Sequence, residues 1–148
     1  MTLRERITED MKTAMRASEK ERLATIRMAL AAIKQQEVDE RITLDDPQTV
    51  AVIEKMIKQR RESIAHFVKG DRADLAAIEQ REIDLLQGYL PEPLSESELD
   101  RIIQDALAST GASSMKDMGK VMGFVKSKAA GRADMGVVSA RIKSALSG

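Results

Sequence analysis

Residues 46–70, DPQTVAVIEKMIKQRRESIAHFVKG, carry the pattern of one long amphipathic helix. Asp46 followed by Pro47 is typical of a helix start, and Gly70 is typical of a helix end. Between them the apolar residues recur every three or four positions, at Val50, Ile53, Met56, Ile57, Ile64, Phe67 and Val68. This spacing places them on one face, so the segment predicts an α-helix that buries one side.

The same helical spacing continues on both sides of this segment. Capping signals open several neighbouring helices, at Thr2-x-x-Glu5, Ser18-x-x-Glu21, Asp71, Ser95-x-x-Glu98 and Asp134. The pattern predicts further helices over approximately residues 2–17, 18–39, 71–88, 95–109, 115–125 and 134–146. No segment alternates apolar and polar residues as a strand would. The sequence therefore predicts an all-α protein, with an N-terminal four-helix part followed by a C-terminal three-helix bundle.

The clearest break in the helical pattern is the segment GYLPEP, residues 88–93. Two prolines two residues apart, Pro91 and Pro93, cannot both lie in a helix interior. We therefore expect an N-terminal helical domain over residues 1–90, a hinge over residues 91–93 and a C-terminal three-helix domain over residues 94–148.

The composition excludes several kinds of active site. The 148 residues include no Cys, no Trp and a single His, His66, which excludes disulfides, cysteine nucleophiles and Cys/His metal sites. Glycine-rich phosphate motifs and the G-x-S-x-G motif are also absent. We expect no catalytic residue, no metal and no cofactor. His66 is interpreted as a structural or surface residue, and the acidic clusters Glu37/Asp39/Glu40 and Glu79/Glu82/Asp84 as solvated helix faces.

No targeting or membrane signal is evident. Residues 1–15, MTLRERITEDMKTAM, mix acids and bases, unlike a secretory signal or a transit peptide. The longest stretch without an ionisable side chain, residues 106–115, is too short and too polar to cross a bilayer. These features predict a cytoplasmic protein with no membrane segment.

Charge is balanced over the chain but unevenly placed. Residues 111–148 hold seven basic and two acidic side chains, a net charge of +5, and residues 1–110 carry the opposite charge. Such asymmetry is typical of a polyanion-binding end, although lysines that merely solvate a helix face remain the alternative. The candidate phosphate-binding residues are Lys120, Lys126, Lys128, Arg132, Arg141 and Lys143.

Glycines punctuate the same region at Gly119, Gly123 and Gly131. A glycine inside a helix costs up to about 1 kcal/mol relative to Ala, so Gly119 and Gly123 indicate that something approaches the backbone closely. A neighbouring helix packed across the small residues is one candidate. A sugar-phosphate backbone held by the flanking lysines is the other, and both can hold on opposite helix faces.

At these residues the sequence resembles the GatB/YqeY family, and specifically its stand-alone YqeY-like members. The resemblance extends over the whole chain and is most specific at the Tyr89-Leu90-Pro91 junction followed by MGKVMG, residues 118–123. Supporting matches lie at residues 23–28, 31–34 and 60–64, and at Gly131, Arg132, Asp134 and Val138.

The resemblance implies an all-helical protein related to the C-terminal tail of the GatB subunit of the glutamine-dependent tRNA amidotransferase. That tail is a tRNA-contacting module, and the chemistry belongs to other domains. We therefore predict a non-catalytic accessory protein that binds tRNA or another structured RNA. The alternative is a protein-protein adaptor that uses Met115, Met118 and Met122 and the hinge at Pro91. A third interpretation, a carbon-nitrogen ligase with glutamine as amide donor, requires a partner that supplies the active site.

Overall fold

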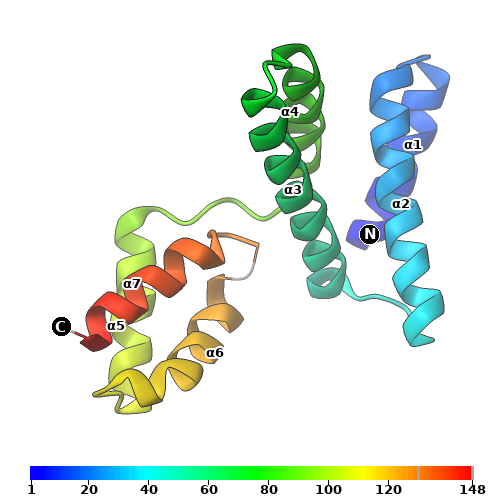
Figure 1. Cartoon of the computed structure of the whole chain (residues 1–148). Helices are drawn as coiled ribbons and strands as arrows, with labels where there is room; N and C mark the ends of the chain where they lie inside the picture. Colours follow the sequence, from blue (N-terminus) through cyan, green and yellow to red (C-terminus); the bar gives the residue numbers. More distant parts are fainter. Residues whose placement is uncertain (130, 148) are drawn as a thin grey trace. The chain divides into compact units, whose positions relative to one another are not determined.

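The computed structural model describes residues 1–129 and 131–147, and within them it contains α-helices, one short 3-10 helix and no strand (Figure 1). The helices are α1 (Leu3–Arg16), α2 (Lys20–Glu40), α3 (Asp46–Lys69), α4 (Ala73–Gln87), α5 (Glu96–Thr110), η1 (Met115–Asp117), α6 (Met118–Ala129) and α7 (Met135–Ser147). The predicted all-α fold class is therefore confirmed.

The chain divides into two compact units, Met1–Leu90 and Pro91–Gly148. Each unit has its own cluster of buried aliphatic side chains, with four helices in the first unit and α5, α6 and α7 in the second. Residues 91–93 lie between α4 and α5 and belong to neither helix. That the units fold independently, with residues 91–93 as a hinge, stays a prediction.

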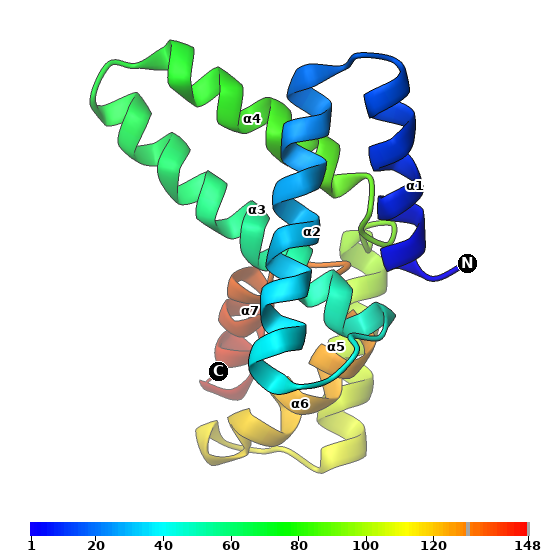
Figure 2. The same cartoon turned by 90° about the vertical axis from the view of Figure 1, so that its right-hand side faces the viewer.

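The first unit is built from two helical hairpins, α1 with α2 and α3 with α4. Its core includes Ile7 of α1, Ile26 and Ile33 of α2, Ile53 of α3 and Leu86 of α4, all almost fully buried. The buried residues of α3 all lie in its first half, at Thr49, Val52, Ile53, Met56 and Ile57. Toward the loop that joins them, α3 and α4 extend away from α1 and α2 (Figure 2).

The helix ends follow the expected chemistry at some positions and differ at others. Thr2 forms the predicted capping box with Glu5, and Gly70 closes α3. Asp45, one residue before the expected Asp46, caps α3 by accepting from the Gln48 N–H. The caps predicted at Ser18 and Asp71 are wrong: both residues have φ of 58°, in the left-handed region, and the tight helix–helix turns there need that conformation.

Two acidic residues interpreted as solvated prove to be held by arginines. Glu37 is buried: one carboxylate oxygen lies 2.9 Å from Arg4 Nη2, and the other accepts from the Leu44 N–H at 3.0 Å. Glu82 is largely buried and lies 2.8 Å from Arg60 Nε, which joins α4 to α3. The interpretation of both acidic clusters as solvated faces was therefore wrong at these positions, because tertiary packing supplied each carboxylate with a cation from another helix.

The second unit is a three-helix arrangement around a smaller aliphatic core. Leu99 and Ile103 of α5, Val125 of α6, and Val138 and Ile142 of α7 are buried together. Ser95 caps α5 as predicted, Gly111 ends it at φ of 65°, and the Asp134 carboxylate accepts from the Gly136 N–H in the first turn of α7. The chain entering α5 is fixed by a hydrogen bond from the Leu94 N–H to the Arg132 carbonyl, 2.8 Å long.

The last residues of the first unit are fixed to α1 by Tyr89. This side chain is buried, and its hydroxyl donates to Asp10 Oδ2 over 2.6 Å. The Arg6 guanidinium lies over the Tyr89 ring and also donates to the Gly88 carbonyl. Burial, followed by the hydrogen bond to Asp10 and the charge of that carboxylate, raises the pKa of Tyr89 above its ordinary range.

A Tyr89→Phe variant keeps the ring and removes the donor to Asp10. Because the acceptor is charged, we expect the free energy of unfolding to fall by about 1.5–3 kcal/mol at pH 7. The raised pKa makes the contribution pH-dependent: it is complete below about pH 10, the ordinary tyrosine value, and is lost as pH rises through the higher pKa of the folded state. Urea unfolding of both proteins from pH 7 to above pH 10 measures this, and a difference that stayed constant would contradict it.

Candidate nucleic-acid interface

Helix α6 presents two of the three predicted glycines, and two of the lysines predicted to contact RNA, on its solvent side. Val121, Val125 and Ala129 are fully buried against the rest of the second unit. Since these residues recur every four positions, they occupy one face and leave the other to solvent. The exposed residues on the solvent face include Gly119, Lys120, Gly123 and Lys126.

The entry to α6 is fixed by Asp117 in η1. Its carboxylate accepts from the Ser113 N–H at 3.0 Å and from the Ser114 N–H at 3.3 Å. These two hydrogen bonds, together with the positive charge of Lys120, lower the pKa of the Asp117 carboxyl. Asp117 is therefore an anion at neutral pH, positioned beside the first turn of α6.

The four candidate lysines are available to a ligand. Lys120, Lys126, Lys128 and Lys143 are exposed, and none of them forms an ion pair within residues 1–129 and 131–147. Lys128 lies over the Phe124 ring, with Nζ 5.3 Å from the ring centroid. Lys116 was not among the predicted RNA-binding residues, although it is also exposed, in η1. It lies four residues before Lys120, and this helical spacing could have indicated that the two lysines share one face.

The two candidate arginines occupy a different environment from the lysines. Arg141 Nη1 lies 2.7 Å from Asp100 and its Nη2 lies 3.7 Å from Glu96, both on α5. Arg132 Nε donates to the Glu92 carbonyl at 2.9 Å, and its Nη2 lies 3.7 Å from Glu98. The arginines therefore connect α7 and the α6–α7 turn to α5, and their predicted contact with RNA competes with these bonds.

The three glycines also divide into two kinds. A Cβ built on Gly119 or Gly123 would meet no atom within 4 Å outside the backbone of α6 itself, so no described helix of the second unit packs across them. Approach by an external group to Gly119 and Gly123 therefore stays a prediction. Gly131 is buried and has φ of 75°, a left-handed conformation that the turn between α6 and α7 requires.

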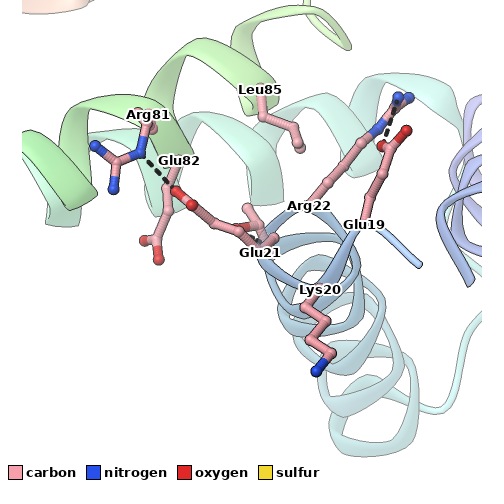
Figure 3. Close-up of a pocket in the computed structure, with 8 residues that line it drawn as sticks. Glu19, Lys20, Glu21, Arg22, Arg81, Glu82 and Leu85 are labelled. Carbon is pink, nitrogen blue, oxygen red and sulfur yellow. Dashed lines mark hydrogen bonds and ion pairs between the residues drawn. The ribbon is translucent and has the colours of Figure 1, made fainter. Parts of the chain in front are cut away.

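The pocket between the start of α2 and α4 is lined largely by paired charged side chains. In Figure 3, Arg81 reaches Glu21 and Arg22 reaches Glu19, with N–O distances of 2.7 and 3.4 Å. Leu85 forms an apolar part of the wall. Apart from Lys20, the charged side chains of this pocket form ion pairs, and the exposed pairs contribute little to stability.

Other kinds of site are not found in the described residues. Residues 1–129 and 131–147 contain no group of three or more His, Asp and Glu side chains that could hold a metal ion. No helix in these residues is long and apolar enough to cross a membrane. His66 is exposed on α3.

The chain is similar to known proteins over nearly its full length. A family model described as Yqey-like protein matches residues 4–146. The protein named "Altered inheritance of mitochondria protein 41, mitochondrial" from Pyrenophora tritici-repentis is 36% identical over 141 residues, which cover 93% of this chain and 77% of the relative. Its namesake from Lachancea thermotolerans is 32% identical, with 92% and 76% covered, and that from Vanderwaltozyma polyspora is 33% identical, with 76% and 64% covered.

These comparisons correct the predicted location and confirm the family resemblance. All three relatives are named as mitochondrial proteins, which contradicts the predicted cytoplasmic location. That prediction rested on the mixed charge of residues 1–15, and this local composition did not determine the compartment. The resemblance seen at residues 89–91 and 118–123 is confirmed by the match over residues 4–146. The chain belongs to the YqeY-like family.

Proposed function

We propose that this protein is a non-catalytic RNA-binding accessory whose ligand is tRNA or a similarly structured RNA. The observation that carries the proposal is the solvent face of α6, where two uncovered glycines lie among exposed lysines that form no ion pair within residues 1–129 and 131–147. The resemblance to the tRNA-contacting tail of the amidotransferase GatB subunit supports the choice of tRNA.

The chemistry of this face suits a phosphate backbone. Lysine ammonium groups bind phosphates as point charges, and each contact releases condensed counterions from the nucleic acid. Gly119 and Gly123 remove the side chains that would otherwise keep a sugar-phosphate strand away from the helix. The lysines would then contact phosphates on either side of the strand.

The available aromatic side chains favour recognition of RNA shape over recognition of unstacked bases. Phe124 is the only aromatic residue in the sequence from 91 to 148, and the Lys128 ammonium already lies over its ring. Single-strand readers stack bases on open aromatic rings, whereas folded RNA is bound through its backbone and shape. We therefore expect low sequence preference.

The two other interpretations have less support. Met118 and Met122 pack partly against the core of their own unit, which leaves Met115 as the exposed methionine of the three proposed for an adaptor surface. A carbon-nitrogen ligase would need an active site supplied by a partner. A pull-down partner that survives nuclease and high salt would favour the adaptor, and glutamine-dependent turnover would favour the ligase.

Replacing Lys120, Lys126 and Lys128 by Ala tests the lysine contacts. If each binds one phosphate, the slope of log affinity for tRNA against log salt should fall in magnitude by about 2–3. The matched control replaces the exposed Lys55, Lys58 and Lys69 of the first unit, which removes the same charge, and its slope should stay close to that of the wild type. Filter binding between about 50 and 200 mM salt measures both. Equal slopes in the two triple variants would refute the proposed interface.

A Gly119→Ala/Gly123→Ala double variant separates stability from binding. Both positions are exposed with open space, so Ala should raise helix stability by about 0.5–1 kcal/mol per site. The added methyl groups should weaken tRNA binding at least about fivefold, equivalent to about 1 kcal/mol. Thermal unfolding and tRNA titration together test this pair of opposite effects. A more stable variant with unchanged affinity would show that the RNA backbone does not approach α6 at these glycines.

A further inference from the structure

A second cationic site lies in the first unit, at the C-terminal end of α2. Glu37 and Val38 lie three and four residues after Lys34 and so share one face of the helix with it, and Arg41 follows as the C-cap residue of α2. Together with Arg4 of α1 and the segment after α2, they line a pocket of about 370 Å³. A pocket of this volume lies within the range that small organic ligands occupy in proteins.

The negative charge in this pocket is already neutralised. Both oxygens of Glu37 have partners, Arg4 Nη2 at 2.9 Å and the Leu44 N–H at 3.0 Å. Lys34 and Arg41 are exposed, and their side chains form no ion pair within the described residues. The pocket therefore holds two uncompensated positive charges.

The remaining acids at this end of α2 do not enter the pocket. Asp39 accepts from the Gln35 amide at 2.9 Å, and Glu40 accepts from the Gln36 amide at 3.0 Å. Neither carboxylate belongs to the pocket wall. An anion bound between Lys34 and Arg41 would therefore meet the fixed, paired carboxylate of Glu37 and no free one among the lining residues.

Apolar and hydroxyl groups complete the wall. Val38 is 58% exposed and Ile42 is 41% exposed, although both are aliphatic, and the Thr43 side chain also lines the pocket. Exposed aliphatic side chains beside two cations match a ligand that carries an anionic group on an apolar body. A bare inorganic anion would use the cations and leave Val38 and Ile42 uncovered.

We propose that this pocket binds an organic phosphate of nucleotide size, with the phosphate between Lys34 and Arg41 and the organic body against Val38 and Ile42. The Arg41 guanidinium can bind two phosphate oxygens at once, and the Lys34 ammonium adds a point charge. The site consists of residues of the first unit and includes none of the α6 lysines, so it stands independently of the function proposed above.

The test is calorimetric titration of AMP, adenosine and inorganic phosphate into the full chain at about 50 mM salt. AMP should bind more tightly than either of its two parts. Arg41→Gly is the informative variant, because Arg41 has φ of 56°, a conformation that glycine adopts without strain, so the fold should be kept. Arg41→Gly and Lys34→Gln should each weaken AMP binding about tenfold, whereas Lys55→Gln, a matched control on α3, should leave it unchanged.

Three results would overturn the proposal: no binding of AMP at millimolar concentration, adenosine binding as tightly as AMP, or equal AMP affinities in wild type and Arg41→Gly. Any of them would leave Lys34 and Arg41 as solvated residues that complement the C-terminal dipole of α2. The Lys120/Lys126/Lys128 variant should retain AMP binding, which keeps this test distinct from that of the α6 interface.

The source of the phosphate is settled by a competition arm with tRNA. If AMP displaces tRNA and Arg41→Gly also weakens tRNA binding, the phosphate in the pocket belongs to RNA. If tRNA binding is unaffected by either, the ligand is a free organic phosphate. Both results support a phosphate site at Lys34 and Arg41, and they differ only in the molecule that fills it.

Discussion

The proposed RNA interface depends on burial of the aliphatic face of α6. Val121 and Val125 are fully buried with Ile103, Val138 and Ile142 of the neighbouring helices. A helix as short as α6 is marginal alone, and each buried aliphatic side chain contributes about 1.5–3 kcal/mol. Exposed ion pairs contribute about 0–1 kcal/mol, so hydrophobic packing and not charge fixes which side of α6 faces solvent.

Within the second unit the two kinds of basic residue have different environments. Arg132 and Arg141 bind carboxylates or carbonyls of α5 and of the segment before it. The guanidinium group suits these fixed, multi-donor contacts, whereas the lysine ammonium is strongly hydrated and remains exposed. The basic C-terminal region is therefore divided between cations that stabilise the unit and cations such as Lys120 and Lys126 that remain accessible.

The first unit shows the same division in another form. Arg4 and Arg60 neutralise Glu37 and Glu82, two largely buried carboxylates that would otherwise have no cation beside them. Lys34 and Arg41 are left exposed beside one of these pairs. Tyr89 then fixes the end of the unit to α1, so that residues 91–93 begin directly after a buried anchor.

The sequence by itself determined the helices and their approximate ends, because apolar spacing and capping residues such as Thr2, Ser95 and Gly70 act over only a few neighbouring positions. It also indicated the basic region and the unusual glycines of residues 118–123. Only the tertiary structure decided that Arg141 is paired while Lys126 forms no ion pair with any residue that the structure describes, that Glu37 is buried, and that Lys34 and Arg41 border one pocket with Arg4. Those outcomes depend on contacts between helices distant in sequence, which no local spacing specifies.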